Sequence, residues 1–303
     1  MEIDINKNRS FTACLRDARN FVTENIKPLI QKTWIPAVVL SVLGAFCIFF
    51  RLPNLSLHNW GIAHPWASWI FQTIIYAGTL IAEIFYFSNV FNAVNGYGRK
   101  KNLWRYVQYF LITVCADVVL CLVAVGLKKL LTLVIGGRTL SHIANMSIFG
   151  IYALICLVLF CLVLIPLLYI APKYMMDPEA KWKQFFKHFS TGLHRWGMLF
   201  LTSLLLIILI GILTFIVALP AIVLILAQIS SQMGLFMGDP SNLPGYFPVL
   251  SFIVFALTTL LFSGLMIYAI VTYIYVYGSI DTQEENKKEL MPKQNEKKQD
   301  TLY

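Results

Sequence analysis

Six long apolar runs decide what this chain can fold into. They cover residues 34–52, 67–91, 104–127, 148–171, 196–219 and 247–277. Crossing the hydrocarbon core of a bilayer takes about 20 helical residues, and each run is close to that length or longer. Only 13% of the residues are charged, whereas soluble domains have about 25%. The runs therefore predict an all-α polytopic membrane protein with six transmembrane helices.

The fifth run continues past Pro220 to about residue 229, which is too long for one straight crossing. Proline removes a backbone donor and clashes with the preceding turn of a helix. The sequence therefore predicts a kink or break at Pro220. It leaves open whether the residues after Pro220 continue a kinked span or form a re-entrant segment.

Lysine and arginine are unevenly distributed among the connections. Twenty of them lie in the N-terminal segment, the second and fourth connections and the tail, and four lie in the other connections. Because cytoplasmic loops carry the excess of Lys and Arg, both termini are predicted to be cytoplasmic. The first 33 residues lack a continuous apolar segment, so we expect no signal peptide. The net charge of +9 then faces a lipid leaflet, and no nucleic-acid partner is expected.

The stretch DPEAKWKQFFKHFSTGLHRW, residues 177–196, predicts an amphipathic helix on the membrane surface. At 100° per residue its aromatic side chains share one face and its basic side chains flank them. Asp177 suits the N-cap and Pro178 the first helical position. An aromatic underside with basic flanks is typical of an interfacial helix. The candidate lipid-interface residues are Lys181, Trp182, Lys183, Phe185, Phe186, Lys187, Phe189, Arg195 and Trp196.

Two other amphipathic stretches precede spans, which gives three predicted cytoplasmic interfacial helices. One begins after Ser10 as N-cap and ends before Pro28, and the other covers about residues 99–110. Each is followed by a hairpin of two spans, which suggests three tandem units. The predicted domains are a cytoplasmic N-terminal segment (1–33), a membrane domain (34–277, with hairpin units 34–91, 104–171 and 196–277) and a disordered cytoplasmic tail (278–303). The tail lacks apolar periodicity and is rich in charge.

The stretch LIPLLYIAPKYMMDPEAKWKQFFKHFSTGLHRWGMLFLTSLLL resembles the membrane domain of glycerophosphoryl diester phosphodiesterases and related six-span bacterial membrane proteins of unknown function. Pro172, Glu179, Ser190 and Gly192 fit the pattern of that group, and Phe186 stands where the group usually has alanine. The resemblance implies an integral-membrane module. It does not imply phosphodiesterase activity, because the catalytic barrel of some relatives has no counterpart here.

Two acidic residues, Glu83 and Asp117, lie inside predicted spans. Intramembrane ionisable residues are costly and are therefore candidates for function. At 1.5 Å per residue both lie about 15 to 18 Å deep, where they could form a proton or ion relay. The alternative is that they are protonated and hydrogen-bond between helices as structural groups.

Three polar residues at the end of the second span, Ser88, Asn92 and Asn95, lie on one stripe beside Asn89. They are candidates for a cytoplasmic vestibule. The alternative is that they make hydrogen bonds between helices at a polar span end.

No sequence motif favours an enzyme or a bound metal. There is no GxSxG, HExxH, P-loop or GxGxxG motif, and His58 and His64 lack a helical ligand spacing. The six cysteines lie on spans or amphipathic segments without a CxxC pair. We expect no catalytic residue, metal or cofactor.

The sequence thus favours a non-enzymatic integral protein of a bacterial cytoplasmic (inner) membrane. Its predicted role is membrane or lipid homeostasis, or a scaffold for an unknown protein partner, with anionic lipid headgroups bound by the interfacial helices. The alternative is a small-solute or ion transporter that uses Glu83 and Asp117.

Overall fold

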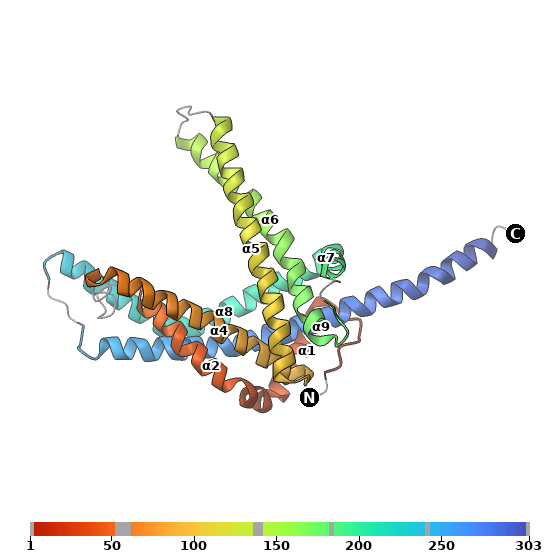
Figure 1. The fold of residues 1–303 in the computed structure, drawn as a ribbon, viewed down its shortest axis with the longest axis horizontal. Coiled ribbons are helices and arrows are strands. Elements are labelled where there is room, and N and C mark those ends of the chain that lie inside the picture. Colours follow the sequence, from red (N-terminus) through yellow and green to blue (C-terminus); the bar gives the residue numbers. More distant parts are fainter. Residues whose placement is uncertain (1–2, 52–61, 136–141, 182–184, 240–242, 301–303) are drawn as a thin grey trace. The chain divides into compact units, whose positions relative to one another are not determined.

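The computed structural model describes residues 3–51, 62–135, 142–181, 185–239 and 243–300, and all the regular structure in these ranges is helical. Six of its helices are long and apolar enough to cross a membrane, which confirms the six predicted spans. The helices are α1 (Phe11–Glu24), α2 (Ile26–Phe49), α4 (Pro65–Asn95), α5 (Arg99–Ile135), α6 (His142–Met176), α7 (Phe185–His194), α8 (Trp196–Phe236) and α9 (Phe247–Asp300), as labelled in Figure 1.

The first amphipathic stretch forms α1, and its start has the predicted cap. The backbone N–H of Ala13 donates to the hydroxyl of Ser10 at 3.4 Å. The helix ends at Asn25, whose side chain donates back to the carbonyl of Phe21 at 3.0 Å. The sequence predicted that the helix is interrupted at Pro28, whereas the interruption lies at Asn25, between α1 and α2. Pro28 lies in the first turn of α2, where its missing N–H removes no helical hydrogen bond.

The stretch 99–110 is not a separate helix, because α5 runs without a break from Arg99 through the third span. The long run through Pro220 is likewise continuous, since α8 extends from Trp196 to Phe236 with the proline inside it. No break in the helix therefore occurs at Pro220. Whether all of α8 lies within a membrane stays a prediction.

The helices form two compact units that do not follow the three predicted hairpins. The first unit comprises Met1–Ile3, Leu15–Leu103 and Leu204–Thr272, and the second comprises Asp4–Cys14, Trp104–Ser203 and Tyr273–Tyr303. Helices α1, α5, α8 and α9 contribute residues to both units. Each unit is described by itself below.

In the first unit, small residues let α2 pack closely against its neighbours. Thr33, Ala37, Ser41 and Ala45 are buried at intervals of four residues along α2. Near them, a Cβ added to Gly44 would lie 2.9 Å from a methyl carbon of a threonine on α9. Small residues at helical spacing allow such close approach between membrane helices, where burial from water gives no driving force.

In the second unit, α5 and α6 lie side by side (Figure 1). The Tyr109 hydroxyl on α5 donates to the carbonyl of Leu167 at 3.3 Å, and the Tyr152 hydroxyl on α6 donates to the carbonyl of Ala124 at 3.0 Å. Tyrosine hydroxyls thus link the two helices at two separate points.

Helix α7 is shorter than the helix predicted from residue 177. It covers Phe185–His194, and α8 begins directly after it at Trp196. Gly192 is buried where α7 meets α6. A Cβ added to Gly192 would lie 3.2 Å from the Cα of Pro166, so only glycine fits this approach without a shift. This glycine is one of the residues on which the family resemblance is based.

The predicted disordered tail begins inside a packed helix. Helix α9 continues to Asp300, and Ser279 and Ile280 are buried. Asp281 forms an ion pair with Lys173 of α6 and accepts a hydrogen bond from the Tyr169 hydroxyl at 2.6 Å. The charged composition predicts disorder, but these charges have partners on another helix. The start of the segment predicted to be disordered therefore has packed partners, and the disorder of the later residues stays a prediction.

Candidate functional site

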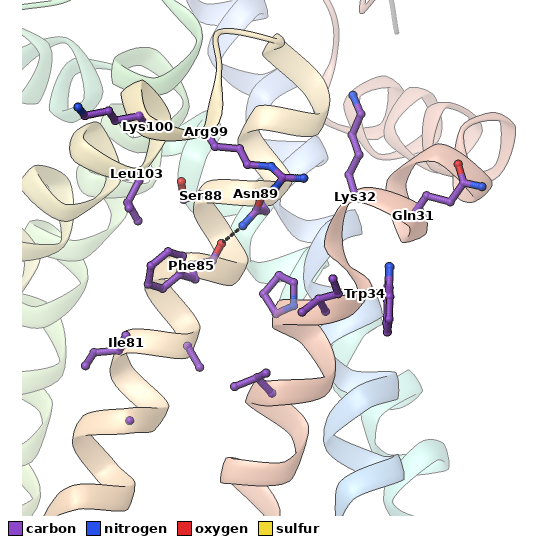
Figure 2. A pocket seen from close by; sticks show the side chains of 15 residues that line it. Gln31, Lys32, Trp34, Ile81, Phe85, Ser88, Asn89, Arg99, Lys100 and Leu103 are labelled. Carbon is purple, nitrogen blue, oxygen red and sulfur yellow. Dashed lines mark hydrogen bonds between the residues drawn. The ribbon is translucent and has the colours of Figure 1, made fainter.

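A groove of about 600 Å³ lies in the first unit between α2, α4 and the start of α5. Figure 2 shows it from close by. Its lining residues come from the basic ends of the three helices and from the apolar surface below them. They are Gln31, Lys32, Trp34, Ile35, Pro36, Val39, Gly78, Ile81, Ala82, Phe85, Ser88, Asn89, Arg99, Lys100 and Leu103.

The two ends of the groove differ in chemistry. One end carries the three cations Lys32, Arg99 and Lys100, all of them exposed, and none of the residues that line the groove is acidic. Figure 2 shows the Arg99 side chain extending towards α2, which carries Lys32, whereas Lys100 extends away from it. The groove therefore has a basic end with no internal counter-charge.

The rest of the groove is apolar. Its side chains include Ile81, which is 56% exposed, and Phe85, which is 46% exposed. Apolar side chains exposed on a helix that spans a membrane face lipid chains or another apolar group. The groove thus runs from an apolar surface to a cluster of cations.

Two polar residues, Ser88 and Asn89, lie between the apolar surface and the cations. The Asn89 side-chain nitrogen donates to the carbonyl of Phe85 at 2.8 Å (Figure 2). Its amide oxygen is then the atom that can accept a hydrogen bond from a ligand. Ser88 is buried beneath it.

Of the predicted vestibule residues, Ser88 lines this groove, and Asn92 and Asn95 lie at the end of α4, next to the turn that joins it to α5. Asn95 exchanges side-chain hydrogen bonds of 2.8 and 2.9 Å with the fully buried Asn102. The Asn92 side-chain oxygen accepts from the backbone N–H of Gly98 at 3.0 Å. Gly96 and Gly98 have φ values of 68° and 95°, which glycine adopts readily.

This turn fixes the start of α5, and so the position from which Arg99 and Lys100 enter the groove. Asn92 and Asn95 thus make hydrogen bonds between helix ends, the structural alternative considered for them. Their contribution to the groove is indirect.

The two intramembrane acids lie in different units. Glu83 is half-buried on α4 of the first unit and is not among the residues that line the groove. Asp117 belongs to the second unit and lines a separate cavity of about 350 Å³ between α5 and α6, together with Thr113, Cys121 and Cys156. A relay that joins the two acids stays a prediction.

The predicted lipid-interface residues of α7 and its flanks have mixed surroundings. Lys181, Phe186 and Lys187 are exposed, Phe186 at 84%. Arg195 is less available to bind a lipid headgroup, because it forms an ion pair of 2.7 Å with Glu284. Phe185 and Phe189 are half-buried, the Trp196 ring stacks on Phe200 at 4.7 Å, and Trp182 and Lys183 lie outside the described residues.

His188, on the same helix, is half-buried. Its Nε2 atom is buried without a hydrogen-bond partner among the described residues. Burial lowers the pKa of His188 from its ordinary value of 6.5, and the positive charge of Lys173 lowers it further. Asp281 and Asp177 act in the opposite direction.

No cluster of three metal-binding side chains occurs in the part of the chain that the structure describes. His58, one of the histidines considered for metal binding, lies outside it. All six cysteines are free thiols.

No family model matches this chain, and no curated protein or solved structure matches it significantly. The site therefore has to be interpreted from its own residues.

Sequence reasoning counted Lys32, Arg99 and Lys100 only towards orientation. Lys32 is far from Arg99 and Lys100 in sequence, and the three residues line one groove because α2 packs against α4 and a short turn joins α4 to α5. The signal in the sequence that could have grouped them is that all three lie at predicted cytoplasmic ends of spans.

Proposed function

We propose that this chain is a non-enzymatic integral membrane protein that binds anionic lipid headgroups at the basic end of the α2–α4 groove. Its role would be in membrane or lipid homeostasis, or as a scaffold that recruits a partner to anionic lipid. The basic end would face the cytoplasm, as the excess of Lys and Arg predicts.

The observation that carries this proposal is the gradient along the groove. Lys32, Arg99 and Lys100 lie at one end, and exposed apolar side chains such as Ile81 and Phe85 continue from them along the helices. A phospholipid has the same order of groups, a charged headgroup followed by acyl chains. Basic pockets between transmembrane helices on the cytoplasmic side bind anionic headgroups for this reason.

Helix α7 supports the same function through a second, less specific contact. Its exposed Phe186 lies beside the exposed Lys187. Such a pair places an aromatic ring in the interface and a cation at the headgroups.

The experiment is to purify the full chain from membranes of known composition and to measure the co-purified lipids by mass spectrometry. Anionic lipids should be enriched over their share of the membrane. Arg99→Gln combined with Lys32→Gln should remove most of the enrichment. Arg16→Gln combined with Lys27→Gln is the matched control, because both residues are exposed cations outside the groove. Equal enrichment in all three proteins would contradict the proposal.

A transporter is the second candidate, and the cavity beside Asp117 is the observation that favours it. The carboxyl has no hydrogen bond or ion pair to any described side chain, although it lines a cavity in an apolar segment. Proton flux in proteoliposomes tests this role. Flux that Asp117→Asn abolishes would favour transport, and absent flux in the wild-type protein would exclude it.

A further inference from the structure

We infer that the groove selects a lipid whose headgroup is a phosphate monoester over lipids whose phosphate is a diester. This inference rests on the proposed function and names the ligand of the same site. It follows from the number of charges at the basic end, the shape of the Arg99 donor group and the apolar surface next to it.

The charges at the basic end exceed what one phosphodiester can neutralise. Lys32, Arg99 and Lys100 carry three positive charges, and no acidic residue lines the groove. A phosphodiester carries one negative charge. A phosphomonoester carries about 1.5 to 2 at pH 7, because its second pKa is about 6. Charge complementarity therefore favours the monoester.

The donors also match a terminal phosphate. The guanidinium of Arg99 is planar and binds two oxygens of a phosphate at once, and Lys32 adds a point charge from α2. A terminal phosphate offers three acceptor oxygens, whereas a diester offers two unesterified oxygens. The third oxygen lets the monoester bind both nitrogens of the Arg99 fork and still accept from Lys32.

The apolar part of the groove identifies the source of the phosphate as a lipid. Ile81 and Phe85 are exposed directly below the polar end (Figure 2), and Val39 lines the same groove from α2. A lipid places its acyl chains beside these side chains and its headgroup at the cations, whereas free phosphate contacts the cations alone.

The test is a lipid titration of the full chain in detergent, followed by native mass spectrometry. Phosphatidic acid, phosphatidylglycerol and phosphatidylcholine with identical acyl chains are the probes. We expect phosphatidic acid to bind about fivefold more tightly than phosphatidylglycerol, since one added charge contact is worth about 1 kcal/mol. Arg99→Gln should weaken phosphatidic acid binding by at least the same factor, and Lys27→Gln should leave it unchanged.

Acidification provides an independent readout. Between pH 7.5 and pH 5 the monoester loses its second charge, while the lysines and arginine of the groove stay protonated. The preference for phosphatidic acid over phosphatidylglycerol should therefore disappear at pH 5. A preference that is unchanged at pH 5 would overturn the charge argument.

The remaining outcomes separate the inference from the proposed function. Equal binding of the two anionic lipids, both weakened by Arg99→Gln, would overturn the inference and leave the proposed function standing. Equal binding of all three lipids would contradict both. Displacement of phosphatidic acid by an equal concentration of inorganic phosphate would show a site for free phosphate and would also overturn the inference.

Discussion

The guanidinium of Arg105 donates a hydrogen bond of 2.8 Å to the backbone carbonyl of Asp177, which follows the last turn of α6. The same side chain also donates to the carbonyls of Tyr174 at 3.1 Å and Pro178 at 2.8 Å, and it is only 8% exposed. The last carbonyls of a helix have no partner within it and carry partial negative charge. Arg105 satisfies one of them, at Tyr174, and holds the two residues Asp177 and Pro178 that follow α6.

Replacing Arg105 by methionine should destabilise the protein strongly. The change keeps most of the side-chain volume but leaves three carbonyls without their donor. Hydrogen bonds to a charged group contribute about 1.5 to 3 kcal/mol each, and the losses overlap, so we expect about 3 kcal/mol in total. The measurement is thermal unfolding in one detergent. Arg16→Met, at an exposed position, should change the midpoint little.

Gly192 should not tolerate a larger side chain. Gly192→Val places atoms against the backbone of Pro166, which cannot move aside as a flexible side chain can. Overpacking of this kind costs about 1 to 3 kcal/mol. Gly211→Val is the control, because nothing lies within 4 Å of a Cβ there. Equal unfolding midpoints for the two variants would show that α7 does not pack on α6 as described.

Asn102 should affect both stability and lipid binding. Asn102→Leu removes the buried side-chain hydrogen bonds that join Asn102 to Asn95 and Asn92, at a cost of about 1 to 3 kcal/mol. Because the turn between α4 and α5 sets the start of α5, the position of Arg99 should change and anionic lipid enrichment should fall. Asn20→Leu, on the exposed side of α1, should change neither quantity. Normal lipid enrichment in a destabilised Asn102→Leu protein would show that the turn does not control lipid binding in the groove.

His188 should make the protein less stable in acid. Its pKa in the folded state lies below the ordinary value of 6.5, so the unfolded chain binds more protons as the pH falls. The free energy of unfolding then decreases as the pH falls below about 6.5. Unfolding midpoints measured from pH 8 to pH 5 test this.

The His188→Gln variant should show a smaller decrease over this pH range than the wild-type protein. His194 is exposed, so His194→Gln is the matched control and should keep the wild-type pH dependence. An identical pH dependence in the His188→Gln and wild-type proteins would show that other groups cause it.

The spans could be predicted from the sequence because hydropathy alone decides whether a segment crosses a bilayer. Which faces pack together could not. Ile81 is exposed and its neighbour Ala82 is buried, yet both are apolar, since a lipid-facing position is as apolar as a packed one. The periodicity that identifies the buried face of a soluble helix is therefore weak here.

The polar residues show the same limit. The stripe of Ser88, Asn92 and Asn95 was predicted as a shared face, but only the structure divides it between the groove and the turn. The composition of the tail predicted disorder, whereas the partners of Asp281 and Glu284 lie more than 80 positions away. Pairings of this kind depend on the fold.

The most direct test of the central claim is the lipid composition that co-purifies with the wild-type protein and with the Lys32→Gln, Arg99→Gln double variant. The claim predicts that anionic lipids are enriched around the wild-type protein and fall close to their bulk share in the double variant. The Arg16→Gln, Lys27→Gln control should retain the enrichment. Anionic lipid that stays equally enriched in the double variant would show that the basic end of the groove does not bind it.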